Sequence, residues 1–154
     1  MATNTTLVGQ QGTKAPIPRP LGDPRKLADP AHRRRLSGPG LKAFFQIADH
    51  WALSIPEQQT LLGAPPRSTL FAWKKGASAT LSRDTLERIS HVVGIFKDLR
   101  ILFPNEKTAD QWIKMPNDED LFGRKPVLDF IMSGSINELI VVHDYLDAQR
   151  GGWV

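Results

Sequence analysis

Four histidines and one acidic triplet are the residues whose types could support metal binding or acid–base chemistry. They are His32, His50, His91, His143 and the run Asp118-Glu119-Asp120. No two histidines are spaced i and i+4, and His143 and its neighbour Asp144 point to different parts of a helix surface. The absence of cysteine excludes disulfides, thiol catalysis and thiolate ligands. We therefore expect no enzyme, no catalytic residue, no cofactor and no metal site, and we interpret the acidic triplet as a solvated loop.

A second group of polar residues has the chemistry of DNA recognition. It consists of Arg67, Ser68 and Thr69 at the start of a short helical segment and Lys74 and Lys75 at its end. In a helix-turn-helix, the first residues of the second helix reach base edges, whereas lysines suit phosphates. These five residues are the predicted DNA-binding set. An ordinary helical hairpin with solvated lysines remains the alternative.

Residues 1–40 have the composition of a flexible, basic, proline-rich tail. Proline and glycine are frequent there and no apolar periodicity appears. The run Arg33-Arg34-Arg35 stands near its end. Two roles stay open for these arginines: an arm that contacts DNA phosphates or the minor groove, and a solubilising segment.

The charges are distributed asymmetrically along the chain. Residues 1–40 carry seven basic and two acidic side chains, and residues 41–104 carry eight basic and five acidic ones. Residues 105–154 carry five basic and nine acidic side chains. The basic N-terminal part of the chain favours a polyanionic partner, and the acidic C-terminal part suggests a different partner. No apolar run reaches membrane-spanning length and no signal-peptide pattern is present, so we expect a soluble cytoplasmic protein without a membrane partner.

Helical periodicity organises the rest of the chain. The first apolar stripe consists of Leu41, Phe44, Phe45, Ala48 and Trp51. Two Ser-x-x-Glu capping boxes, at residues 54–57 and 135–138, open later helices. The expected helices run from Leu41 to Trp51, from Ser54 to Gly63, from Arg67 to Lys75, from Ser82 to before Pro104, around Trp112, from Val127 to Ser133 and from Ser135 to about Arg150. No strand pattern competes, so the predicted fold is all-α.

Two domains follow from this order of helices. Two short helices around a glycine turn, preceded by an amphipathic helix, meet the requirements of a helix-turn-helix. In the second short helix, Leu70 and Trp73 are expected to pack inward. We predict a DNA-binding and dimerisation domain over residues 41–104 and a smaller helical domain over residues 105–154.

The chain ends with a tryptophan that follows two glycines. Glycine stops the last helix and leaves Trp153 one residue from the carboxylate. An aromatic of this size buries about 150–250 Å², which is roughly 4–6 kcal/mol of gross transfer free energy. Trp153 therefore needs an apolar place, either in the protein's own core or in a pocket of a partner.

A series of short motifs extends from Leu53 to the C-terminus. They are Leu70-Phe71-Ala72-Trp73-Lys74, Leu81-Ser82, Glu87-Arg88-Ile89, Leu102-Phe103-Pro104, Trp112-Ile113, Pro116-Asn117, Phe122-Gly123-Arg124-Lys125-Pro126, Gly134 and Arg150-Gly151-Gly152-Trp153. In this order and spacing, residues 41–154 resemble an Xre-type antitoxin with an Xre/MbcA/ParS toxin-binding domain. The resemblance does not cover the tail.

The resemblance implies a function that composition could not supply. Such antitoxins bind RES-domain toxins, which deplete NAD⁺, and their C-terminal end obstructs the toxin's active site. Together with the toxin they repress their own operon. The implied partners are a RES-domain toxin and operator DNA, in a homodimer and a higher toxin–antitoxin complex. The implied toxin-binding residues, within residues 105–154, are Arg124, Lys125, Arg150, Gly151, Gly152, Trp153 and Val154.

Two other functions stay open on the residues alone. A stand-alone helix-turn-helix regulator, with a C-terminal dimerisation domain, would bind its operator tightly without a partner. An interaction adaptor with a degenerate helix-turn-helix would bind no specific DNA. Ala72 and Pro65-Pro66 leave the recognition helix sparse in base-reading groups, so we expect DNA binding to depend on avidity in an oligomer.

Overall fold

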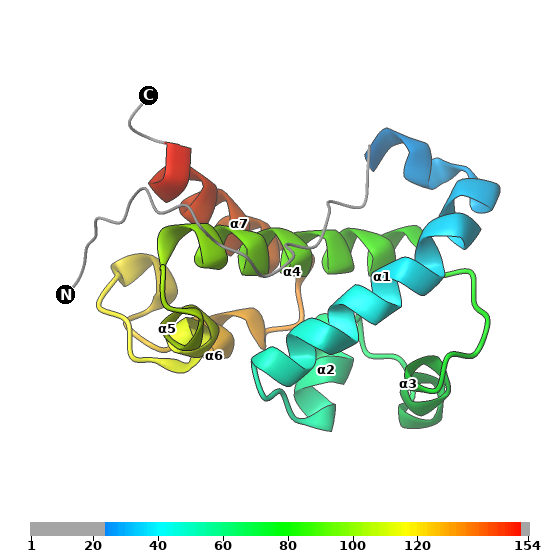
Figure 1. The fold of residues 1–154 in the computed structure, drawn as a ribbon, viewed down its shortest axis with the longest axis horizontal. Helices are drawn as coiled ribbons and strands as arrows, with labels where there is room; N and C mark the ends of the chain where they lie inside the picture. The colour runs from blue at the N-terminus through cyan, green and yellow to red at the C-terminus, as the bar shows by residue number, and fades with distance from the viewer. Residues whose placement is uncertain (1–23, 152–154) are drawn as a thin grey trace. The chain divides into compact units, whose positions relative to one another are not determined.

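The computed structural model describes residues 24–151, and every regular element in that range is a helix (Figure 1). The elements are η1 (Pro24–Ala28), α1 (Pro30–His50), α2 (Ile55–Leu61), α3 (Arg67–Lys74), α4 (Arg83–Leu102), α5 (Glu106–Gln111), η2 (Trp112–Lys114), η3 (Asp120–Phe122), α6 (Val127–Ile131) and α7 (Ile136–Gly151). The predicted all-α fold is confirmed. Among these described helices, none combines the length and the apolar composition that a membrane span requires.

The described chain divides into two compact units, and the boundary lies inside α4. We call residues 24–93 the N-terminal unit and residues 94–151 the C-terminal unit. Helix α4 supplies buried side chains to both, because Leu86 and Ile89 precede the boundary and Ile95 and Leu99 follow it.

Helix α1 begins at Pro30, well before the predicted start at Leu41. Asp29 caps the helix, since its Oδ1 accepts the backbone N–H of Ala31 at 3.0 Å. Proline is favourable at the first helical position because the N–H that it lacks would have no partner there. The interpretation of residues 30–40 as tail is therefore wrong: they are helical in the structure.

A buried serine holds the middle of α1, where Pro39 interrupts the helical hydrogen bonds. The Ser37 hydroxyl donates to the carbonyl of Arg33 at 2.7 Å and accepts the N–H of Leu81 at 2.8 Å. Ser37 is fully buried, so the bond from Leu81 satisfies a buried backbone donor that would be costly to leave unpaired. This contact spans 44 residues of sequence, which is why the local composition of residues 30–40 did not indicate it.

The core of the N-terminal unit follows the predicted apolar spacing with two exceptions, Phe45 and Trp73. Leu41, Phe44, Ala48 and Trp51 are buried as predicted, whereas Phe45 is only half-buried. In α3, Leu70 is fully buried, while Trp73 is half-buried. The recognition-helix candidate is therefore anchored chiefly through one leucine.

The start of α2 has the capping box that its sequence predicts. The Glu57 N–H donates to Ser54 Oγ at 3.2 Å, and the Ser54 N–H donates to Glu57 Oε1 at 2.8 Å. After α2, Gly63 adopts a φ of +92°, which is the left-handed region that glycine tolerates best. This glycine makes the turn between α2 and α3.

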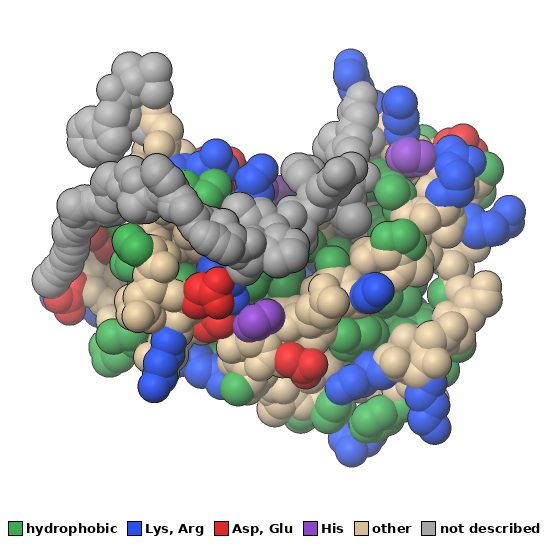
Figure 2. All heavy atoms as spheres, viewed as in Figure 1, with side chains coloured by type: hydrophobic (Ala, Val, Ile, Leu, Met, Phe, Trp, Pro, Cys, Tyr) green, Lys and Arg blue, Asp and Glu red, His purple; other side chains and the backbone are tan. Residues whose placement is uncertain are grey.

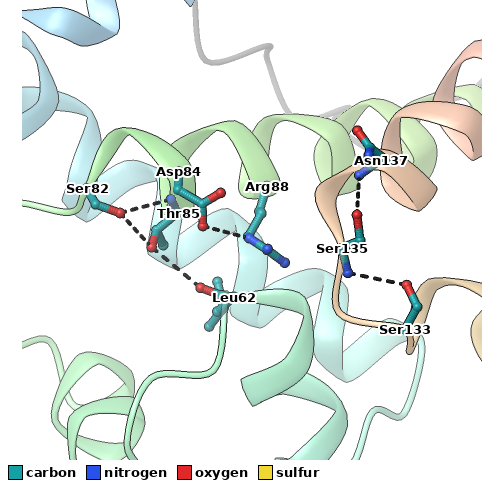
Figure 3. Close-up of polar contacts among 8 residues, drawn as sticks. All are labelled: Leu62, Ser82, Asp84, Thr85, Arg88, Ser133, Ser135 and Asn137. Atoms are coloured by element: carbon teal, nitrogen blue, oxygen red, sulfur yellow. Dashed lines mark hydrogen bonds and ion pairs between the residues drawn. The ribbon is translucent and has the colours of Figure 1, made fainter.

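The first turns of α4 brace that turn (Figure 3). Ser82 Oγ accepts the N–H of Thr85 at 3.1 Å, and Thr85 Oγ1 donates to the carbonyl of Leu62 at 3.5 Å. A Cβ at Gly63 would lie 3.2 Å from Arg88 Nε. Helix α4 thus contacts the turn that connects α2 to α3.

The C-terminal unit packs short helices around a continuous apolar core. Its buried side chains are Ile95, Phe96, Leu99, Ala109, Ile113, Phe122, Val127, Leu128, Ile131, Leu139, Val142 and Leu146. The Phe122 ring makes edge-to-face contacts with Phe130 at 5.3 Å and with Tyr145 at 5.2 Å between ring centroids. Phe122 therefore joins η3 to both α6 and α7.

The second predicted capping box is not formed (Figure 3). Ser135 Oγ accepts the N–H of Asn137 at 3.1 Å, and the Ser135 N–H donates to Ser133 Oγ at 3.3 Å. With that N–H already bonded, Glu138 does not complete the box, and its Oε1 is buried without a hydrogen-bond partner. Ser135 still caps α7, but it does so by accepting the N–H of Asn137, the second residue of the helix.

Candidate functional site

The predicted DNA-reading residues lie together on α3. Arg67, Ser68, Lys74 and Lys75 are exposed, and Thr69 is half-buried. Figure 2 shows Lys and Arg side chains over the part of the surface where Figure 1 has α3. The arrangement offers a cationic helix surface to a polyanion.

Two aromatic rings hold cations on this surface. The Arg67 guanidinium lies 5.1 Å from the centroid of the Phe71 ring, and Lys74 Nζ lies 5.5 Å from that of Phe45. Such cation–π contacts are worth about 0.5–1 kcal/mol at exposed sites. The half-buried position of Phe45, which its spacing did not predict, lets it support a lysine of the neighbouring helix.

The N-terminus of α3 has no side-chain cap. Pro66 occupies the capping position and offers no oxygen to the first backbone N–H groups of the helix. Uncapped first-turn N–H groups and the helix dipole suit a phosphate or another anion. Arg67 at the first helical position adds a full positive charge there.

The predicted arginine triplet divides between two roles. Arg33 donates from Nε to Leu81 O at 3.2 Å, and from Nη1 to Leu27 O at 3.0 Å. Because these backbone carbonyls occupy its guanidinium, Arg33 ties η1 and the segment before α4 to α1. Arg34 and Arg35 are exposed on α1.

The first predicted toxin-binding pair lies in the turn between η3 and α6. Arg124 and Lys125 are both exposed. Gly123 and Arg124 adopt φ values of +65° and +60°, so the turn uses the left-handed region twice in succession. Arg124 Nε bonds Asp120 Oδ1 at 2.8 Å, but both side chains are largely exposed, at 69% and 85%. Since exposed ion pairs contribute little to stability, this arginine is available to a partner.

The second predicted toxin-binding group is at the end of α7. Arg150 Nη1 bonds Oδ1 of Asp98 in α4 at 2.8 Å, and Asp98 is 1% exposed. Burial, together with the neighbouring Asp147, raises the pKa of Asp98 to about 7, and Arg150 opposes the shift. The Arg150–Asp98 pair therefore fastens the last turn of α7. Gly151 is exposed, and Gly152, Trp153 and Val154 lie outside the described residues.

The fold also assembles a cluster that the sequence did not predict. One ligand-type atom from each of Asp98, His143 and Asp147 lies within 4.8 Å of the other two. The spacing of the histidines along the chain did not predict this cluster. The i, i+4 spacing of His143 and Asp147 could have been recognised in the sequence. Asp98 is distant in sequence, and only the packing of α4 against α7 brings it beside these two residues.

Comparison with known proteins assigns a family to each part of the chain. Residues 30–94 match the antitoxin Xre-like helix-turn-helix domain, and residues 98–152 match the antitoxin Xre/MbcA/ParS C-terminal toxin-binding domain. The chain belongs to the Xre antitoxin family. Both domains are of non-enzymatic families, as the absence of a catalytic constellation in the sequence predicted.

One relative of this antitoxin extends the comparison. The protein described as "Uncharacterized protein y4oB" from Sinorhizobium fredii is 53% identical over 112 residues, which is 73% of this chain and 84% of the relative. No solved structure matches the antitoxin.

The family assignments show to which domain each of the predicted binding surfaces belongs. The helix-turn-helix match begins at residue 30, where α1 begins, so the extra turns of α1 belong to that domain. The toxin-binding match covers Arg124, Lys125, Arg150, the Asp98 cluster and the last turn of α7. A toxin is thus the partner class of the C-terminal domain.

Proposed function

We propose that this antitoxin neutralises a RES-domain toxin that depletes NAD⁺, and that it represses its own operon through the helix-turn-helix. The toxin-binding domain at residues 98–152 carries the first half of the proposal. The resemblance carried by the motifs from Leu53 to Trp153 favours a RES-domain toxin, and the acidic excess of residues 105–154 suits a protein partner rather than DNA.

The C-terminal end is the proposed inhibitory element. The bond between Arg150 and the buried Asp98 supports a firmly held last turn of α7. From that anchor, Gly151 and Gly152 let the backbone enter a narrow opening, and Trp153 provides the apolar group that fills it. Exposed Arg124 and Lys125 provide a second, cationic contact with the toxin.

Recruitment to the operator is assigned to α3. Arg67, Ser68 and Thr69 are proposed to reach base edges, while Lys74 and Lys75 contact phosphates. Arg34 and Arg35 on α1 are available for further phosphate contacts, whereas the backbone bonds of Arg33 favour a structural role. The sparse base-reading set supports operator binding by an oligomer formed with the toxin.

The toxin assignment is tested by expressing a RES-domain toxin encoded beside this antitoxin, with and without it. Without the antitoxin we expect the cellular NAD⁺ concentration to fall and growth to stop, because the toxin active site is open. With the antitoxin, both should return to the uninduced level and the two proteins should purify together. A stable complex with a toxin that leaves NAD⁺ unchanged would contradict the RES assignment while retaining the toxin-binding domain.

The DNA assignment is tested by substitution on α3. Arg67→Ala is expected to weaken binding of the toxin–antitoxin complex to operator DNA by about 1–3 kcal/mol and to relax its sequence preference. Lys74→Ala should weaken binding to all sequences and reduce the slope of log affinity against log salt by about 1. Fluorescence anisotropy at several salt concentrations measures both.

Lys107→Ala provides the control for these variants, because it removes one exposed positive charge from α5 in the C-terminal unit. If Lys107→Ala changes the salt slope as much as Lys74→Ala does, α3 is not the DNA-contacting helix.

A further inference from the structure

We propose that Asp98, His143 and Asp147 form a binding site for a divalent transition-metal cation of the Zn²⁺ class in the C-terminal unit. Asp98 comes from α4, and the other two residues lie one turn apart on α7. Their ligand atoms lie within 4.8 Å of one another, and His143 Nε2 is 3.6 Å from Asp147 Oδ2. Zinc binds His nitrogen and carboxylate oxygen at about 2.0–2.2 Å, so a small inward movement of the side chains would bring all three into coordination.

An unpartnered buried oxygen is the observation that points to a ligand. Asp98 is 1% exposed, and its Oδ1 accepts Arg150 Nη1 at 2.8 Å. Its Oδ2 is buried and has no hydrogen-bond partner. The nearby carboxylate of Asp147 offers only acceptor oxygens unless the two acids share a proton, which is the contact by which Asp147 raises the pKa of Asp98. A buried acceptor of this kind is costly, and a bound cation would satisfy it.

The local charge also favours a cation. Asp98 and Asp147 bring two negative charges when ionised, and Arg150 neutralises one of them. With His143 neutral, the cluster retains one negative charge. A divalent ion would compensate this charge and use the imidazole as a neutral ligand.

The combination of ligands selects the class of ion. One imidazole nitrogen and two carboxylate oxygens suit Zn²⁺ and its neighbours in the first transition row, whereas Ca²⁺ and Mg²⁺ prefer oxygen ligands throughout. Three protein ligands leave a fourth position for water or for a group of a partner. The Asp147 side chain is 50% exposed, which opens the site to solvent.

Gly94 makes room for the imidazole. A Cβ built on Gly94 would overlap the His143 ring, with its closest approach at Nε2. The imidazole therefore lies directly against the backbone of α4, four residues before Asp98 in the sequence. Any larger residue at position 94 would displace a ligand nitrogen.

The test is calorimetric titration of the full-length antitoxin with Zn²⁺, alongside Co²⁺ absorption spectroscopy. We expect one saturable site per chain and visible d–d bands from bound Co²⁺. Asp147→Asn and His143→Gln should each lower the Zn²⁺ affinity at least about tenfold. Circular dichroism establishes that each variant is folded.

Two matched variants separate this site from general surface attraction. Asp144→Asn removes the same charge from an exposed residue of α7 that is outside the cluster, and His91→Gln removes an imidazole from the N-terminal unit. Both should bind Zn²⁺ with the affinity of the unaltered chain. If the unaltered chain binds no Zn²⁺, or if Asp144→Asn weakens binding as much as Asp147→Asn, the proposal is wrong. Because the antitoxin is titrated alone, the result is independent of which toxin it neutralises.

Discussion

Deletion of residues 152–154 is expected to abolish neutralisation of the toxin while leaving the antitoxin folded. These residues follow the last turn of α7. That turn is held by the bond of 2.8 Å between Arg150 Nη1 and Asp98 Oδ1, which the deletion leaves intact. Removing a buried interfacial tryptophan costs at least about 2 kcal/mol, a factor of about 30 in affinity. NAD⁺ concentration and growth during toxin co-expression measure the loss of rescue.

Deletion of residues 152–154 tests the inhibitory role of the C-terminal end more specifically than deletion of residues 150–154 would. Removing Arg150 as well would leave the buried Asp98 without its cation, so stability and inhibition would change together. Trp153→Ala alone should reproduce most of the loss, and Gln149→Ala, which alters an exposed residue of α7, should not. Full rescue by the deleted chain would show that the toxin is neutralised elsewhere, with Arg124 and Lys125 the next residues to alter.

Phe44→Ala is expected to have the largest effect on stability. The Phe44 side chain is fully buried on α1, and truncation of a buried phenylalanine to alanine costs about 3–5 kcal/mol. Since small domains have free energies of unfolding of about 5–15 kcal/mol, this loss removes a large part of the total. Urea unfolding followed by circular dichroism measures it, and the melting temperature should fall by about 10 °C or more.

Phe45→Ala is the matched control for that substitution. The two rings are neighbours in sequence and make an edge-to-face contact at 5.5 Å, but Phe45 is only half-buried. We expect Phe45→Ala to cost less than about 2 kcal/mol in unfolding. It should instead weaken DNA binding modestly, because the ring lies beneath Lys74. Equal destabilisation by both variants would contradict this division of roles.

The sequence patterns predicted the features of this antitoxin that depend on residues close to one another in the chain. The spacing of Leu41, Phe44, Ala48 and Trp51 placed one face of α1 in the core, and Ser54 with Glu57 marked the start of α2. Helical periodicity and capping depend on neighbours within about four residues, so a single sequence contains them. The same spacing predicted more burial for Phe45 than the structure shows, because spacing alone cannot separate the centre of a buried face from its edge.

Features that depend on distant partners were not predictable in this way. The composition of residues 30–40 predicted a tail, yet Ser37 is tied to Leu81 at 2.8 Å and the segment is helical. Arg33 looked like a DNA-contacting cation, but distant carbonyls occupy its guanidinium. In both cases a tertiary contact outweighs a weak local preference.

By itself, the sequence determined the all-helical class, the helix-turn-helix, the order of motifs that marks the toxin-binding domain and the exposed cations of α3. These depend on residue type and on short-range spacing. Only the tertiary structure decided that Arg150 pairs with a buried aspartate, and that this aspartate faces His143 and Asp147 across α4 and α7. The physical reason is that burial and long-range electrostatics arise from the packing of helices far apart in the chain, and no local pattern records which side chains will meet there.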